Sequence, residues 1–229
     1  MQVIYEDNHI LVVVKPQNVP VMADSSKDKD MLTLCKEYIK EKADKPGNVY
    51  LGLLHRLDRP TGGVMVFAKT SKAAGRISEA IREGEVEKNY FAILLGAPRE
   101  RQGKLTHYLL KDEKANTVNI VPMSTEGAKK AMLEYWIAGE YKQLSLARIK
   151  LITGRTHQIR VQMNSLKTPI LGDIKYGGDT MPKGFNLALW AYELKFYHPV
   201  TKVKMVFRCY PPESKTWEVF GTVIKSIMM

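Results

Sequence analysis

Short apolar runs alternate with polar segments through the first part of the chain. Val3–Tyr5 and Ile10–Val14 lie on either side of a polar turn, which predicts two short strands. From Met31 to Ala43 the apolar positions recur at near-helical spacing, which predicts a helix. The apolar runs Leu51–Leu54 and Val64–Ala68 are expected to be further strands. This part of the chain therefore predicts mostly strands, with one helix between them.

A helix and then a long series of strands are expected next. Thr70 or Ser71 can cap the helix at its start, and Gly84 is expected to end it. The turn residues Gly139–Lys142 predict that two of the following strands form a hairpin. The pattern places these strands at Tyr90–Leu95, Leu105–Leu109, Thr117–Val121, Lys130–Ala138 and Leu144–Ile152.

The last third of the chain mixes both kinds of element. A helix is expected from Thr156, strands near Leu194–Tyr197 and Val203–Cys209, and a closing helix over Glu213–Ser226. Many strands with few helices predict an α+β fold, with a mostly antiparallel mixed sheet flanked by helices and loops. Because no linker is long or rich in Gly and Ser, residues 1–229 are expected to form a single domain.

The net charge of the chain favours a polyanionic partner. The chain of 229 residues has 35 Lys and Arg against 24 Asp and Glu, a formal net charge of +11. Such an excess suits nucleic acid before other partners. A basic protein with no such partner would have the same composition, so the charge alone leaves both readings open.

The cysteines and the N-terminal residues indicate a cytoplasmic protein. Cys35 and Cys209 lie far apart and outside any Cys-x-x-Cys pattern, which argues against structural zinc and against a disulfide framework. The N-terminal residues lack the basic start and apolar core of a signal peptide. The longest early apolar run, Ile10–Val14, is too short to span a bilayer. We therefore expect no metal ion and no membrane contact, and we expect a monomer.

One acid stands out because of the residues around it. Asp58 lies between Arg56 and Arg59, on a segment that Pro60 excludes from helix and from regular strand. The pair Gly62–Gly63 permits a tight loop that feeds the next strand. A carboxylate beside cations stays ionised, and the same arginines could hold a phosphate. A surface turn with local pairing is the simpler alternative for such an acid.

Two later segments carry further candidate chemistry. Tyr90 enters a strand, where its ring can stack on a base and its hydroxyl can relay a proton. Arg155 lies between a strand end and a helix start, where polar groups are well placed for an anion. His157 and Arg160 lie one helical turn apart and could share a face toward RNA. For His157 alone, capping or packing is the favoured role, because no metal partners accompany it.

These segments together resemble the signature of a known family. The run His55-Arg56-Leu57-Asp58-x-x-Thr61-Gly62-Gly63, followed by an apolar strand and Ala68-Lys69-Thr70, closely resembles the RluA-type RNA pseudouridine synthases. The strand ending in Lys15-Pro16 also resembles that family, and we give this dipeptide a structural role. Further similar segments are Lys88-Asn89-Tyr90, Leu151–Met163, Gly172–Gly177 and Leu187–Ala191 with His198-Pro199. Trp190 departs from the family's usual histidine, which we attribute to local packing.

The resemblance implies a function and roles for the candidate residues. Asp58 is implied as the catalytic residue, Tyr90 as the residue that lies against the target base, and Arg155 as the partner of the Asp58 carboxylate. The enzyme would cut the glycosidic bond of a uridine in ribosomal or transfer RNA, turn the uracil and rejoin it through carbon. Ribosomal RNA is slightly favoured. No cofactor is needed, because no electrons or external groups are transferred.

RNA recognition is expected to come from the catalytic domain itself. Many members of the resembled family carry a small RNA-binding module before the catalytic domain, and we expect none here, because the first strand begins at residue 3. The candidate RNA-binding residues are Arg56, Arg59, His157 and Arg160.

Two rival functions and one mechanistic question stay open. A non-catalytic RNA-binding or ribosome-assembly protein would explain the charge but not Asp58, Tyr90 and Arg155 together. A metal-dependent nuclease using Asp58 and Asp173 ranks last, because no third carboxylate or histidine converges with them by spacing. Whether Asp58 attacks the sugar as a nucleophile or removes a sugar proton as a base is equally compatible with the sequence.

Overall fold

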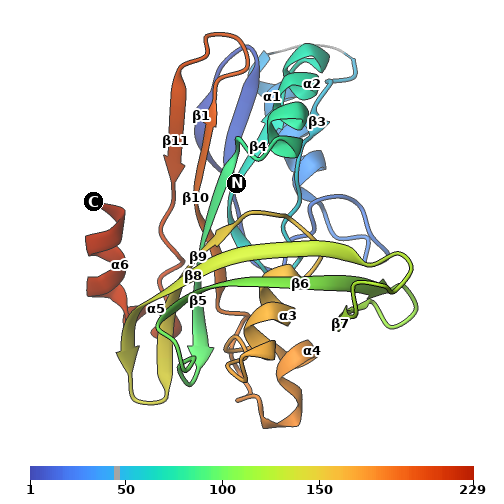
Figure 1. The fold of residues 1–229 in the computed structure, drawn as a ribbon. Helices are drawn as coiled ribbons and strands as arrows, with labels where there is room; N and C mark the ends of the chain where they lie inside the picture. Colours follow the sequence, from blue (N-terminus) through green and yellow to red (C-terminus); the bar gives the residue numbers. More distant parts are fainter. Residues whose placement is uncertain (44–46) are drawn as a thin grey trace. The chain divides into compact units, whose positions relative to one another are not determined.

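The computed structural model describes residues 1–43 and 47–229, and this part of the chain divides into two compact units (Figure 1). The first unit contains residues 1–86 and 193–209, and the second contains residues 87–192 and 210–229. Both units are therefore discontinuous in sequence.

The first unit is built on antiparallel strands. Strand β2 pairs with β1 on one side and with β4 on the other, and β3 and β4 are also paired. Strands β2 and β4 are almost entirely buried, which matches their continuous apolar runs. Its elements are β1 (Gln2–Glu6), β2 (Ile10–Lys15), α1 (Met31–Ala43), β3 (Gly52–Leu53), β4 (Gly62–Ala68), α2 (Ser71–Arg82), the end of β10 (Leu189–Tyr197) and β11 (Lys204–Arg208).

The segment 193–209 is tied to the first unit by a buried polar contact. Strands β10 and β11 pair antiparallel. At their turn, His198 is 3% exposed, its Nε2 lies 2.8 Å from Asp7 Oδ2, and its Nδ1 accepts the Thr201 amide at 3.0 Å. Asp7 Oδ1 in turn accepts the amides of His9 and Ile10. One histidine therefore joins the β1–β2 turn to a segment nearly two hundred residues later.

The second unit is a longer antiparallel sheet with strand order β5-β9-β8-β6-β7. Helix α3 packs against one of its faces through a buried apolar cluster that includes Val161 and Ala131. Its elements are β5 (Glu87–Leu95), β6 (Gln102–Asp112), β7 (Thr117–Val121), β8 (Lys129–Tyr141), β9 (Leu144–Leu151), α3 (Gln158–Ser165), α4 (Ile174–Gly177), the 3-10 turn η1 (Gly178–Thr180), the start of β10, α5 (Lys215–Glu218) and α6 (Gly221–Met228).

The structure confirms the α+β class and the mostly antiparallel sheet, and it corrects three local predictions. The β8–β9 hairpin turns at Lys142 rather than at Gly139, because Gly139 follows a β-bulge and the strand continues to Tyr141. The expected closing helix is two helices, separated where the buried Phe220 precedes Gly221. Strand β10 begins earlier than expected and includes the apolar run from Leu189.

No helix in residues 1–43 and 47–229 is long and apolar enough to cross a membrane.

Candidate active site

The Asp58 loop precedes strand β4 in the first unit. The Thr61 amide donates to the Asp58 carbonyl at 2.9 Å, which closes a tight turn around Pro60. Leu57 is buried below the turn, whereas Asp58 is half-buried. Gly63 has a φ of 128°, a conformation that favours glycine, and it begins the pairing of β4 with Lys15 of β2. The carboxylate therefore stands on a loop whose backbone is fixed by its neighbours.

Lys15 stabilises the Asp58 loop through hydrogen bonds to backbone carbonyls. Its side chain is fully buried at the end of β2, and its Nζ donates to the carbonyls of Pro16 at 2.9 Å and Arg59 at 3.0 Å. Burial lowers the pKa of Lys15 to about 7, the Asp58 carboxylate opposes that shift, and the Arg59 cation adds to it. Sequence reasoning gave Lys15-Pro16 a structural role but did not foresee that the ammonium group contacts the Asp58 loop.

Two more side chains fix the backbone around Asp58. Gln17 Nε2 donates to the Pro60 carbonyl at 3.1 Å. His55 Nε2 accepts the Val66 amide of β4 at 3.1 Å, which requires that this ring nitrogen carry no proton. The histidine of the motif thus anchors the segment before Asp58 to the following strand.

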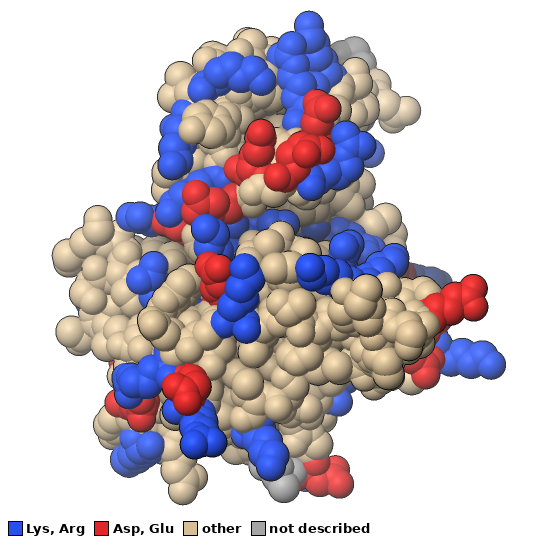
Figure 2. Space-filling view, viewed as in Figure 1, with Lys and Arg blue, Asp and Glu red and all other residues tan. Residues whose placement is uncertain are grey.

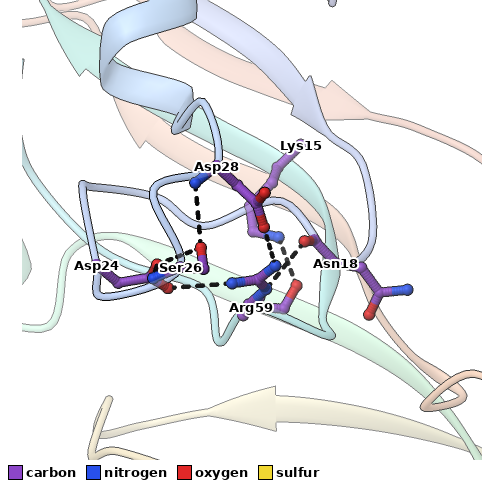
Figure 3. Close-up of polar contacts among 6 residues, drawn as sticks. All are labelled: Lys15, Asn18, Asp24, Ser26, Asp28 and Arg59. Carbon is purple, nitrogen blue, oxygen red and sulfur yellow. Dashed lines mark hydrogen bonds and ion pairs between the residues drawn. The ribbon is translucent and has the colours of Figure 1, made fainter.

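Arg59 is held by an acidic segment of the same unit (Figure 3). Its Nε donates to the Asn18 carbonyl at 3.2 Å, one terminal nitrogen contacts Asp24 at 3.3 Å, and the other contacts Asp28. The Arg59 side chain is nevertheless 39% exposed. A phosphate that bound Arg59 would compete with the two carboxylates. Arg56, by contrast, is exposed.

Tyr90 lies in strand β5 of the second unit, where it is 6% exposed and pairs with Ile149 of β9. Because side chains alternate along a strand, Tyr90 and Lys88 share one face of the sheet. Burial lowers the pKa of Lys88. Lys88 also lies close to the Arg155 loop, since its Nζ would stand 3.3 Å from a Cβ placed on Gly154. The unit thus brings together the two segments that carry Tyr90 and Arg155.

The Arg155 loop is shaped by a buried amide, Gln158. Its Oε1 accepts the Thr153 hydroxyl at 2.8 Å and the Arg155 amide at 3.0 Å. Its Nε2 donates to the Met132 carbonyl at 3.0 Å, and the residue is 2% exposed. Arg155 itself is exposed, and its Nε donates to the Lys130 carbonyl at 3.0 Å. Sequence reasoning missed Gln158; a polar residue at the first buried position of a helix was the available signal.

His157 and Arg160 do not share an exposed face. His157 has a φ of 50° and precedes the helix, with its Nδ1 2.7 Å from the Tyr176 hydroxyl. Arg160 is 6% exposed, and its Nε and a terminal nitrogen bind the Asp173 carboxylate at 2.8 and 2.7 Å. In this structure the Arg160 guanidinium forms a buried bidentate ion pair, and a contact between Arg160 and RNA stays a prediction.

The same ion pair bears on the nuclease alternative. Asp173 is 1% exposed, and besides binding Arg160 it accepts the Tyr176 amide at 3.3 Å as the cap of α4. Within residues 1–43 and 47–229, no group of three or more His, Cys, Asp or Glu residues is arranged to hold a metal ion. The Asp173 carboxylate thus has a structural role in its own unit.

Comparisons with known proteins place the chain in a family. A model of the RNA pseudouridylate synthase family matches residues 9–165. The ribosomal large subunit pseudouridine synthase C of Buchnera aphidicola is 33% identical over 233 residues, covering 99% of this chain and 70% of that protein. The ribosomal large subunit pseudouridine synthase D of Vibrio cholerae is 33% identical over 228 residues, covering 93% of this chain and 68% of that protein.

A solved structure shares the fold. The human RNA pseudouridylate synthase domain containing 4 superimposes with a TM-score of 0.80 at 22% identity, covering 98% of this chain and 93% of that chain. The chain therefore belongs to the RNA pseudouridine synthase family, and specifically to its RluA-type branch, as its motifs indicated. It is an isomerase that acts on RNA.

Proposed function

We propose that this enzyme isomerises uridine in ribosomal RNA, with Asp58 as the catalytic carboxylate. The observation that carries the proposal is the fixed loop in which Lys15, Gln17 and His55 hold the backbone around a half-buried Asp58. A loop held at several points presents its acid in one geometry, which a reacting group needs. Relatives named for the large ribosomal subunit favour ribosomal RNA over transfer RNA as the substrate.

In this proposal the target uridine leaves the base stack, so that its sugar and base can reach Asp58. The glycosidic bond breaks, the uracil turns, and a bond forms between carbon atoms of base and sugar. Asp58 acts as an ionised nucleophile or base in the first of these steps. Tyr90 would lie against the uracil and relay the final proton, and Arg155 would pair with the Asp58 carboxylate.

The remaining roles concern RNA binding and the working state. Arg56 and His157 would contact RNA, and Arg59 would do so after releasing Asp24 and Asp28. Arg160 would support the site from within the second unit, through Asp173. The reaction transfers no electrons and no external group, so the proposal includes no metal ion or cofactor. We also propose that the enzyme is cytoplasmic and works as a monomer, and that residues 1–229 form one catalytic domain.

The test is the variant Asp58→Asn, which keeps the shape of the side chain but removes its nucleophilic and basic oxygen. The substrate is ribosomal RNA from cells lacking the gene. The rate of pseudouridine formation by Asp58→Asn should be roughly a thousandfold or more below that of the wild type, with RNA affinity retained. Asp179→Asn, an exposed acid of the second unit, is the matched control. An Asp58→Asn variant that still forms pseudouridine would exclude the catalytic role of Asp58.

A further inference from the structure

Strand β8 presents two very different faces. The side chains of Ala131, Leu133 and Tyr135 point into the unit and are at most 3% exposed. The side chains between them point the other way and are more exposed. With their neighbours on β6 and β9 they form a surface that we call the basic sheet face, which comprises Lys104, Lys130, Trp136, Arg148 and Lys150.

The strand register places these residues side by side. Trp136 stands directly opposite Arg148 of β9, and Glu134 stands between Lys104 and Lys150. Glu134 is the acid in this row, and its carboxylate is 3.9 Å from the Lys104 ammonium. Cations thus exceed acids on this face. Figure 2 shows Lys and Arg side chains together with Asp and Glu on the side of the molecule drawn in Figure 1. A surface of this charge attracts a polyanion.

Trp136 is the unusual member of the face. Of the three tryptophans in the chain, Trp190 and Trp217 are 3% and 5% exposed, whereas Trp136 is 39% exposed. Phe220 and Val223 of the C-terminal segment lie near Gly139, beyond the bulge of the same strand, and leave Trp136 accessible. A large, partly exposed aromatic ring on the outer face of a strand offers a flat apolar surface to a partner.

We propose that the basic sheet face binds an unpaired stretch of the RNA substrate, with one base stacked on Trp136 and the flanking phosphates bound by Arg148, Lys150 and Lys104. The proposal rests on the proposed function only in that the substrate is RNA. An aromatic ring beside cations is the combination that binds single-stranded nucleic acid, because every base has a face that can stack. Bases in a duplex already stack on one another and leave no face for the indole.

The first experiment uses the tryptophan itself as the probe. Because Trp190 and Trp217 are buried, quenching of the intrinsic fluorescence by a short oligouridine reports on Trp136. The wild type should be quenched. Trp136→Phe should lose the quenching but keep most of the affinity, because the ring can still stack. Trp136→Thr should bind the oligouridine about tenfold more weakly. Tyr197→Thr, an exposed aromatic on β10, is the control and should bind like the wild type.

The second experiment tests the phosphate contacts. The affinity of oligouridine is measured across a salt series for Arg148→Gln and for the control Arg82→Gln, an exposed arginine of α2. Each phosphate contact with single-stranded RNA contributes about 0.7 to the slope of log affinity against log salt. Arg148→Gln should therefore lower the slope by about that amount. A control variant with the same loss would show that only net charge matters and would overturn the proposal.

The outcomes separate this proposal from the proposed function. If Trp136→Thr binds oligouridine as the wild type does, the surface proposal is wrong even when the enzyme forms pseudouridine normally. If Trp136→Thr keeps its affinity but loses single-turnover rate at saturating enzyme, Trp136 belongs to the chemistry and the proposal is again overturned. If the wild type forms no pseudouridine but its fluorescence is quenched and the Thr variant binds weakly, the surface stands and the proposed function fails.

Discussion

The buried ammonium of Lys15 makes a quantitative prediction about stability and pH. Its Nζ is fully enclosed and donates to two loop carbonyls, and burial lowers its pKa from 10.5 to about 7. In the unfolded chain this lysine keeps its ordinary pKa. The informative perturbation is Lys15→Met, which keeps a long unbranched side chain but cannot titrate.

The sign and the size follow from proton linkage. Between pH 7 and pH 10.5 the unfolded chain holds a proton on Lys15 that the folded chain has released, so stability rises with pH in this interval. Each pH unit inside the interval adds about 1.4 kcal/mol. Between pH 6 and pH 9 the free energy of unfolding of the wild type should therefore rise by about 2 to 3 kcal/mol relative to that of Lys15→Met. The rise comes from the roughly two pH units that lie above the folded pKa of Lys15.

The assay is urea unfolding of both proteins at several pH values between 6 and 9, followed by circular dichroism. Circular dichroism reports on both units, whereas Trp136, Trp190 and Trp217 all lie in the second unit. Lys72→Met, an exposed lysine of α2, controls for the loss of a positive charge. If the curves of unfolding free energy against pH for the wild type and Lys15→Met run parallel, Lys15 does not titrate in this range and the reasoning is refuted.

Three further changes test the candidate site. Tyr90→Phe should bind RNA nearly as the wild type does but slow a late proton transfer, and full activity would reduce Tyr90 to a stacking surface. Arg155→Lys should lower the single-turnover rate by about tenfold or more, because an ammonium cannot bind a carboxylate with two parallel hydrogen bonds; a rate close to that of the wild type would show that Arg155 supplies charge alone. The double variant Asp24→Asn, Asp28→Asn should release Arg59 and tighten RNA binding about two- to fivefold, as suits partly exposed ion pairs, and an unchanged dissociation constant would mean that Arg59 does not contact RNA.

Most elements were predictable because their signals are local. The strands around the Asp58 loop and the helix capped by Thr70 follow from apolar spacing and turn chemistry, and Thr70 Oγ1 does accept the Ala73 amide at 3.2 Å. The errors came where tertiary packing decides. Gly139 was assigned to a turn because glycine favours turns, whereas a bulge lets the strand continue past it. The closing helix was predicted as continuous because apolar spacing does not report the break at Phe220.

In the candidate site, too, local backbone features were predictable from the sequence and contacts between distant residues were not. The loop around Asp58 was readable because proline and glycine restrict the backbone locally. The contact from Lys15 to Arg59 joins residues far apart in sequence, so no spacing rule could reveal it. The pair of Arg160 and Asp173 was missed for the same reason. Helical spacing placed Arg160 beside His157 but did not tell which face is buried.

The discontinuity of the first unit has a consequence for how the chain folds during synthesis. Residues 1–86 emerge from the ribosome first, but Phe207, whose ring lies 5.5 Å from that of Tyr5, and His198, which lies against Asp7, emerge only after the whole of 87–192. Until then, the apolar surface that the segment 193–209 covers is exposed in the nascent chain. The second unit, by contrast, has its five consecutive strands β5–β9 within residues 87–151. We therefore expect the strands β5–β9 to form their sheet first, the first unit to be completed only when residue 209 has been made, and the second unit to be completed last, by residues 210–229.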